Sequence, residues 1–231
     1  MARQKARLPL RLSLRSGALL GALAGAAYSV WLRPRMLTWG AAPDEINTAL
    51  PGDEMISNPA LVITRAVTIS APVEAVWPFV AQLGRGGTGW YAYDAFDNGG
   101  APSYEIARRD LPAPVPGMAM DRGFTIAYVE SPRALVFTGA LTTDLVAPSW
   151  GSYAYVLNAH AHGTRLVVRV RTTVDDVVGR AQLVAAFEPI DFLMMVKQLN
   201  GIKQRAERFA AHQMNQSRPP DGLIVPYKFA V

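Results

Sequence analysis

The chain of 231 residues contains no cysteine. This absence excludes disulfide bridges, thiolate metal ligands and a cysteine nucleophile. It does not fix the compartment, because an exported domain of this size can fold without disulfides. Internal repeats and low-complexity tracts are also missing, and the length suits one domain of roughly 150 residues with appendages.

The chain also lacks an excess of basic residues outside its N-terminus. The formal net charge is +5, but residues 1–35 hold seven of the 23 basic residues and no acidic one. The other residues therefore carry 16 basic against 18 acidic side chains, a net charge of −2. A nearly neutral body has no electrostatic footprint for a phosphate backbone, so we expect no nucleic-acid partner.

Charge is also absent from residues 16–32, a run of seventeen residues between basic flanks. As a helix this run would span about 25 Å, close to the ~30 Å hydrocarbon core of a bilayer. Tyr28 and Trp31 lie at one end, where interfacial aromatic residues gather. We therefore predict a single-pass membrane protein, held in the lipid bilayer through residues 16–32. The five basic residues before the run favour a cytoplasmic N-terminus.

Two alternatives to a retained anchor stay open. A basic start, an apolar run and small residues around positions 22–26 are also typical of a cleaved signal peptide, and the run could instead form a peripheral helix. Gly17, Gly21 and Gly25 repeat every four residues. This spacing predicts a face for close packing between membrane helices, although an alanine- and glycine-rich run can contain it by chance.

The chain divides into four predicted parts. Residues 1–35 form the basic N-terminus and transmembrane anchor. Residues 36–60, with prolines at 43, 51 and 59, indicate an irregular linker that has one helical turn at 44–48. Residues 61–212 form the folded domain, and residues 213–231 form a C-terminal tail that could pack on the domain or contact a partner.

Within the domain, β-branched residues predict a strand over 61–70, and Pro72 opens a helix in which Pro78 predicts a kink or an early end. Further strands are expected at 103–108, 118–122, 124–129 and 134–139. A hairpin of 153–157 and 164–173 follows, and its second arm places Arg165, Arg169 and Arg171 on one face.

The last predicted element is a long helix that starts at Glu188. Apolar residues recur along it at steps of three or four, so one of its faces must be covered. The strands between 61 and 173 are the elements that can cover it. A strand, a helix, antiparallel strands and a long C-terminal helix, in this order, make the helix-grip arrangement.

The sequence also resembles a known family. Residues 64–72 (Thr-Arg-Ala-Val-Thr-Ile-Ser-Ala-Pro), continued by Val76-Trp77-Pro78-Phe79, resemble the opening of the polyketide-cyclase-like branch of the START/SRPBCC superfamily. Residues 84–94, 164–166 and 201–207 resemble it too, while Trp39-Gly40 and residues 50–54 resemble the linker of actinobacterial-type members.

This resemblance covers about residues 39–211. It implies an α+β helix-grip fold, START/Bet v 1-like, in which an antiparallel sheet wraps around the C-terminal helix. It does not specify a ligand, because the superfamily includes lipid carriers, cyclases, hydrolases and hormone receptors.

Aromatic and methionine residues from several elements should converge beneath the last helix and border one apolar cavity. The predicted ligand pocket consists of Trp77, Phe79, Tyr91, Tyr93, Asp94, Phe124, Tyr153, Tyr155 and Met195. We therefore predict a membrane-anchored protein that binds a hydrophobic small molecule, a lipid or polyketide-like compound. The alternatives are a polyketide cyclase- or dehydratase-like enzyme, which the resemblance implies, and an accessory subunit of a membrane protein complex.

No catalytic, cofactor-binding or metal-binding motif is recognised. The glycine cluster 84–89 lacks the lysine and serine/threonine end of a P-loop, so we interpret it as a mobile loop at the cavity entrance. His160 and His162 have no obvious third partner for a metal. Residues 90–97 either place Tyr91, Tyr93 and Asp94 at a pocket mouth or form a short capped helix that plugs the sheet edge.

Overall fold

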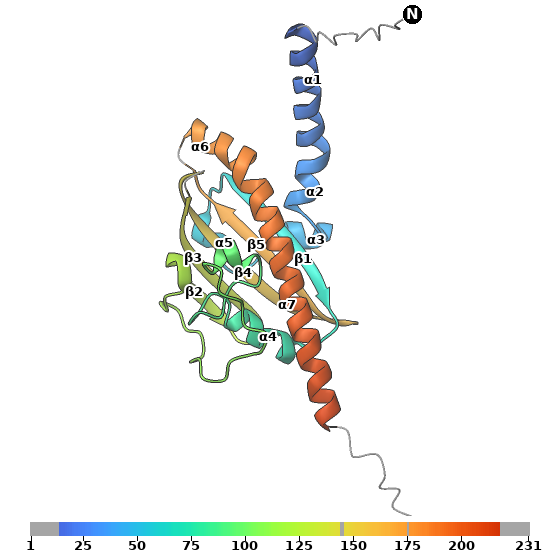
Figure 1. Cartoon of the computed structure of the whole chain (residues 1–231), viewed down its shortest axis with the longest axis vertical. Coiled ribbons are helices and arrows are strands. Elements are labelled where there is room, and N and C mark those ends of the chain that lie inside the picture. Colours follow the sequence, from blue (N-terminus) through green and yellow to red (C-terminus); the bar gives the residue numbers. More distant parts are fainter. Residues whose placement is uncertain (1–13, 144–145, 175, 218–231) are drawn as a thin grey trace, which may run out of the picture.

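The computed structural model describes residues 14–143, 146–174 and 176–217. Five antiparallel strands form one sheet in the order β1-β5-β4-β3-β2, and the long helix α7 crosses one face of it (Figure 1). The face toward α7 is named the inner face here, and the opposite face the outer face. An antiparallel sheet gripping a long C-terminal helix is the predicted architecture.

The strands are β1 (Leu61–Ile69), β2 (Thr125–Glu130), β3 (Ala134–Thr143), β4 (Val146–His160) and β5 (Gly163–Thr172). The helices are α1 (Leu14–Ala27), α2 (Arg33–Leu37), α3 (Pro43–Asn47), α4 (Val73–Ala81), α5 (Asp94–Asp97), α6 (Val177–Gln182) and α7 (Glu188–Ser217). The π-helical turns Tyr28–Leu32 and Leu183–Phe187 join α1 to α2 and α6 to α7.

Two predicted strands are wrong, and two helical features differ from the prediction. Residues 103–108 and 118–122 form no strand; the backbone of Tyr104 and Arg108 bonds to Thr88 and Gln82 instead, and Ala119 makes one isolated bridge to Thr125. Prolines between the two segments remove donors that a ladder needs. Helix α4 continues three residues past Pro78, so the early end, one of the two expected outcomes, does not occur. Helix α6 and its π-turn precede α7 and were not predicted.

Strand register arranges the inner face in rows. One row runs across four strands through Leu135, Tyr155, Val168 and Arg65, and the next through Phe137, Tyr153, Val170 and Ile63. Helix α7 covers these rows with a buried stripe spaced at three or four residues, and each large apolar side chain buried there stabilises the fold by about 1.5–3 kcal/mol. The stripe consists of Met195, Leu199, Ile202, Ala206 and Ala210.

The predicted linker packs on the outer face of the sheet. Arg165 pairs with both carboxylate oxygens of Glu45 at 2.6 and 2.7 Å, and this partner lowers the pKa of Glu45. Arg169 bonds Asp53 at 2.7 Å. Gly52 lies so close to Val136 that a β-carbon there would fall 2.6 Å from the valine side chain. Residues 36–60 are therefore part of the folded body and not a free spacer.

The N-terminal helix corrects the membrane prediction. Among the described residues, no helix is long and apolar enough to cross a membrane. The helical backbone changes its hydrogen-bond pattern within the uncharged run, because α1 ends at Ala27 and continues as a π-turn into α2. Tyr28 donates to the carbonyl of Val184 at 3.2 Å, which ties that turn to the body. The prediction of single-pass localisation through residues 16–32 is therefore contradicted.

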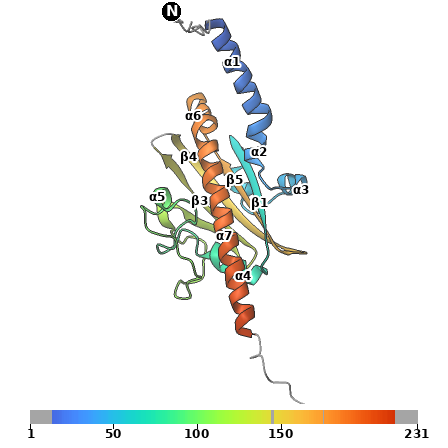
Figure 2. The same ribbon diagram turned by 45° about the vertical axis from the view of Figure 1, so that its right-hand side comes forward.

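Helix α1 stands clear of the sheet in both views (Figures 1 and 2). Nothing lies within 4 Å of a β-carbon built at Gly17, Gly21 or Gly25. The described residues thus offer no helix that packs on this glycine face. At the other end α7 extends to Ser217, and the rest of the predicted tail lies outside the described residues.

Candidate functional site

Aromatic rings form a continuous cluster on the inner face. Phe137 stacks on Tyr153 and Tyr155, with ring centroids 5.2 and 5.6 Å apart. Phe124 and Trp90 meet Phe137 edge-on at 5.2 and 5.7 Å. Each such pair stabilises by about 0.5–1.5 kcal/mol beyond the burial of its area. Between the sheet and α7, the rings therefore pack directly against one another.

A buried ion pair lies beside this cluster. Arg65 is fully buried, and its Nη1 donates to the Asp191 carboxylate of α7 at 2.6 Å, while its Nε donates to the Met36 carbonyl at 2.8 Å. Its Nη2 is buried and has no partner among the described residues. Burial raises the pKa of Asp191, and the positive charge of Arg65 opposes that shift.

The two tyrosines of the cluster differ in their hydroxyl groups. Tyr155 donates to Oε1 of Gln198 on α7 at 2.5 Å. The hydroxyl of Tyr153 makes no hydrogen bond within the described part of the chain. Burial raises the pKa of Tyr153 well above its ordinary value, and the negative charge of Asp191 adds to the effect. Tyr153 therefore lies within electrostatic range of the Asp191 carboxyl group, and it keeps 8% of its surface exposed.

Two further polar atoms at this site are unpaired. The indole Nε1 of Trp90 and Oδ2 of Asp97 are buried without a hydrogen bond to any described residue. Burial raises the pKa of Asp97 to about 6, and Arg122 opposes this shift. Burial also raises the pKa of Tyr155, and the negative charges of Asp191 and Asp97 add to this effect. Both carboxyl groups therefore lie within electrostatic range of Tyr155. We name Arg65, Trp90, Asp97 and Tyr153 the unpaired inner set.

The glycine cluster 84–89 forms a packed turn that positions Trp90. The amide of Gly84 donates to the carbonyl of Gly89 at 2.9 Å, and within the cluster only Gly86 and Gly87 are exposed. A β-carbon at Gly84, where φ is +58°, would lie 2.3 Å from the Trp90 ring. The predicted entrance loop therefore locks an aromatic side chain into the cluster.

Tyr91, the next residue, is held in an unusual conformation. Its φ of +60° is rare for a bulky side chain. Gln82 donates to its hydroxyl at 2.6 Å, and the Arg205 guanidinium lies 4.5 Å from its ring centroid. Burial raises the pKa of Tyr91 to about 12. The hydrogen bond to its hydroxyl and the guanidinium over its ring thus hold Tyr91 in this strained conformation.

The structure brings some predicted pocket residues together and separates others. Phe124, Tyr153 and Tyr155 belong to the aromatic cluster, whereas Phe79 contacts Tyr91 and Phe209 in a second group beneath α7. Met195 is buried on α7, Trp77 is partly buried, and Tyr93 is 43% exposed. Their role in holding a ligand stays a prediction.

The Asp94 carboxylate is hydrogen-bonded to residues close to it in the sequence. Its carboxylate accepts hydrogen bonds from the hydroxyl and amide of Ser103 at 2.6 and 3.1 Å and from Asn98 at 3.0 Å. These bonds tie α5 to the loop that follows it. The short-helix interpretation of residues 90–97 fits this geometry, since α5 starts at Asp94.

Sequence reasoning missed most of the unpaired inner set. A signal existed for Arg65, because it occupies an inward position in the alternation Ile63, Val67, Ile69, where an apolar residue is expected. A charge in such a position requires a buried partner. Trp90 and Asp97 carry no comparable signal, because they lie on irregular segments whose direction depends on tertiary contacts.

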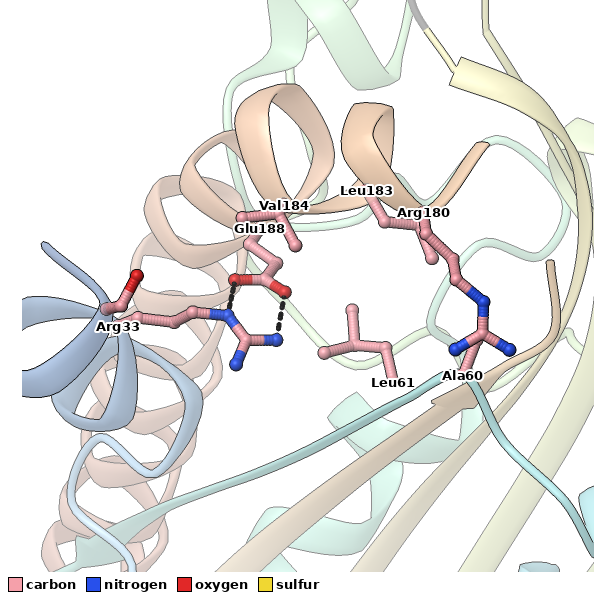
Figure 3. Close-up of a pocket in the computed structure, with 8 residues that line it drawn as sticks. Arg33, Ala60, Leu61, Arg180, Leu183, Val184 and Glu188 are labelled. Carbon is pink, nitrogen blue, oxygen red and sulfur yellow. Dashed lines mark hydrogen bonds and ion pairs between the residues drawn. The ribbon is translucent and has the colours of Figure 1, made fainter. Parts of the chain in front are cut away.

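A pocket opens where the N-terminal helix meets the body, and we name it the junction pocket. Its volume is about 320 Å³. Figure 3 shows Arg33 and Glu188 joined on one side, the Arg180 side chain on the other beside Ala60, and Leu61 between them. Its lining is Ser29, Arg33, Ala60, Leu61, Arg180, Leu183, Val184 and Glu188. A second, surface pocket is lined by Gln204, Glu207, Arg208 and Ala211, and neither contains a predicted pocket residue.

Metal-binding geometry is not found in the part of the chain that the structure describes, where no three His, Cys, Asp or Glu side chains are placed to hold an ion. His160 and His162 lie at the β4–β5 hairpin tip with ring centroids 5.6 Å apart, and both are exposed.

No protein-family model and no curated protein matches the chain. Solved structures with similar folds include a protein from Mesorhizobium loti (16% identity, 64% of this chain and 98% of that one, TM-score 0.41). DynU16 of the dynemicin biosynthetic locus is 18% identical over 60% of this chain and 46% of its own, with a TM-score of 0.38. StfQ, a di-domain ARO/CYC of the steffimycin pathway, is 13% identical over 71% of this chain and 55% of its own, with a TM-score of 0.39. With TM-scores below 0.5, these likenesses establish neither family nor function.

Proposed function

We propose that this protein binds a hydrophobic small molecule with oxygen substituents on the inner face of the sheet, beneath α7. The observation that carries this proposal is the unpaired inner set. Among the described residues, Arg65, Trp90 and Asp97 each have a buried polar atom without a partner near an aromatic cluster, and the Tyr153 hydroxyl, which makes no hydrogen bond there, belongs to a ring of that cluster. A buried polar atom without a partner costs about 1–3 kcal/mol, so such atoms are retained where something else bonds them.

The chemistry of the set describes its ligand. Arg65 and Trp90 offer donors and Asp97 offers an acceptor. The Tyr153 hydroxyl can donate or accept. An aromatic or polycyclic molecule with hydroxyl and keto groups would satisfy them while its rings stack on Phe137. Phe124 is only partly buried, so rotation of its ring is the smallest change that admits a ligand. The resemblance to the START/SRPBCC superfamily agrees with this role.

The experiment compares two neutral probes, 2-naphthol and naphthalene, by fluorescence titration of the full chain. We expect 2-naphthol to bind at roughly micromolar affinity, equivalent to about −8 kcal/mol. It should bind roughly tenfold more tightly than naphthalene, because one satisfied hydrogen bond contributes about 1 kcal/mol or more.

A matched pair of variants locates the site. Trp90→Phe keeps an aromatic ring but removes the unpaired Nε1, so the preference for 2-naphthol should shrink several-fold. Trp150→Phe is the control, because Trp150 lies on β4 with about half of its surface exposed and outside the cluster. Equal binding of both probes, or equal behaviour of both variants, would refute the proposal.

A second candidate function uses the same residues for acid–base chemistry, as in cyclisation or dehydration of a polyketide-like substrate. It is favoured by the Asp191 carboxyl group, whose pKa is raised by burial, lying in electrostatic range of the free Tyr153 hydroxyl. Incubation with a 1-(2-hydroxyphenyl)-1,3-diketone tests it by mass spectrometry, because its hydroxyl can add to the distal carbonyl, close a six-membered ring and lose one water. An enzyme is supported if the wild-type chain forms product and Asp191→Asn does not, while circular dichroism and 2-naphthol binding stay unchanged. If the wild-type chain forms no product, the enzymatic candidate is refuted and the binding function stands alone.

A further inference from the structure

The junction pocket is lined by two positively charged side chains and one negatively charged side chain. Arg33 donates to both carboxylate oxygens of Glu188, each at 2.7 Å, so these two charges neutralise each other. Side-chain hydrogen bonding to Glu188 raises the pKa of Arg33. Arg180 lies on the opposite wall, and its guanidinium makes no hydrogen bond or ion pair with any described residue, although its backbone amide donates to the Asp176 carbonyl at the start of α6. The pocket therefore retains one uncompensated positive charge.

Apart from Ser29, the remaining side chains that line the pocket are apolar. Leu61 and Leu183 belong to the buried core, and Ala60 and Val184 extend the same lining. At about 30 Å³ per water-sized group, the 320 Å³ volume accommodates roughly ten non-hydrogen atoms. This size is at the lower end of the range for small-molecule sites, about 300–1,000 Å³.

We propose that the junction pocket is a second binding site, separate from the inner face, for a small amphiphilic anion such as a medium-chain carboxylate. The anionic head accepts charge-assisted hydrogen bonds from Arg180, and the hydrocarbon part covers Leu61 and Leu183. The intact Arg33–Glu188 pair forms the opposite polar wall. Because Ser29 and Arg33 come from the N-terminal helix and the other lining residues from the body, a bound anion bridges the two.

Calorimetric titration of the full chain with sodium octanoate tests the site, with 1-octanol as the uncharged comparison. Octanoate has about ten non-hydrogen atoms and should bind with a dissociation constant below about 1 mM, several-fold more tightly than octanol. Arg180→Gln should weaken octanoate binding roughly tenfold, because a hydrogen bond to a charged group is lost. Ser29→Trp, at an exposed lining position, should fill the pocket and abolish binding of both compounds.

Arg109→Gln is the matched control, since Arg109 is also exposed and unpaired among the described residues but does not line the pocket. Octanoate should also slow amide hydrogen exchange over residues 28–37 in the wild-type chain. Tyr153→Phe should leave octanoate binding unchanged, which separates this site from the inner-face site. Octanoate affinity that is equal in wild type, Arg180→Gln and Ser29→Trp would overturn the proposal, whatever the outcome with 2-naphthol.

Discussion

Buried arginines on the two faces of the sheet differ in how many of their N–H donors are hydrogen-bonded. On the outer face, all five N–H donors of Arg169 are used, two of them on the Thr64 hydroxyl and the Asp53 carboxylate and three on backbone carbonyls of residues 45–48. Asp53 Oδ1 accepts no hydrogen bond but lies 3.5 Å from Arg171. On the inner face, Arg65 is equally buried and leaves Nη2 unpaired.

This difference separates a structural role from a functional one. The outer arginines hold residues 36–60 against the sheet, and Arg169 uses all of its donors in doing so. The inner face combines aromatic packing with polar atoms that packing alone does not satisfy. Destabilising changes should therefore concentrate on the outer face, and changes that affect binding without loss of stability on the inner face.

The largest effect is expected at Arg169. Arg169→Leu removes five hydrogen bonds, which takes the donor from three carbonyls and the closest cation from Asp53, so the free energy of unfolding should fall by about 3–5 kcal/mol. Urea unfolding measures this. Arg109→Leu, at an exposed position, should change stability by less than about 0.5 kcal/mol. A loss below about 1 kcal/mol at Arg169 would show that the linker is not held as described.

A smaller effect is expected at the turn that positions Trp90. Gly84→Ala introduces a β-carbon 2.3 Å from the indole at positive φ, and should cost about 2–4 kcal/mol and shift the tryptophan fluorescence. Gly87 has the same sign of φ, but nothing lies within 4 Å of a β-carbon there. Gly87→Ala should therefore cost only about 1 kcal/mol. Equal effects would mean that Trp90 is not locked by this turn.

The pH dependence of stability should reveal the buried Asp97 carboxyl. Its pKa is about 6 in the folded state against an ordinary 3.8, so the folded state retains the proton that the unfolded state releases. The stability that Asp97 contributes is therefore complete below pH 3.8 and is lost as pH rises through 6. Asp97→Asn should match the wild type near pH 4 and be more stable by about 1 kcal/mol at pH 7, after solvent screening of this half-buried group. Parallel stability curves from pH 4 to 7 would contradict this.

Much of the fold could be predicted from periodicity. The strand predicted at 61–70 is β1, and the strand predicted at 134–139 lies within β3, because β-branched alternation is a local property. The face of Arg165, Arg169 and Arg171 was also correct, since register alone sets it. What the arginines bind could not be predicted, because Glu45 and Asp53 lie more than a hundred residues away in the sequence.

Less of the candidate site than of the fold could be predicted from the sequence. The ring contacts of Tyr153 and Tyr155 follow from strand alternation, but the direction of Trp90 depends on a turn with four glycines at positive φ. The uncharged run 16–32 predicted a membrane span from composition. In the structure, the end of that run is bonded to the body through Tyr28 and the following Arg33, which are contacts that composition does not encode.

The most direct test of the central claim compares Tyr153→Phe with Tyr155→Phe. Both tyrosines point inward from β4, but of the two only the Tyr155 hydroxyl is hydrogen-bonded to a described residue. Tyr155→Phe leaves Gln198 Oε1 unpaired and should lower the free energy of unfolding by about 1–2 kcal/mol. Tyr153→Phe should leave stability within about 0.5 kcal/mol of the wild type and weaken 2-naphthol binding roughly fivefold. If Tyr153→Phe instead destabilises the protein as much as Tyr155→Phe and leaves 2-naphthol affinity unchanged, the unpaired inner set does not serve a ligand.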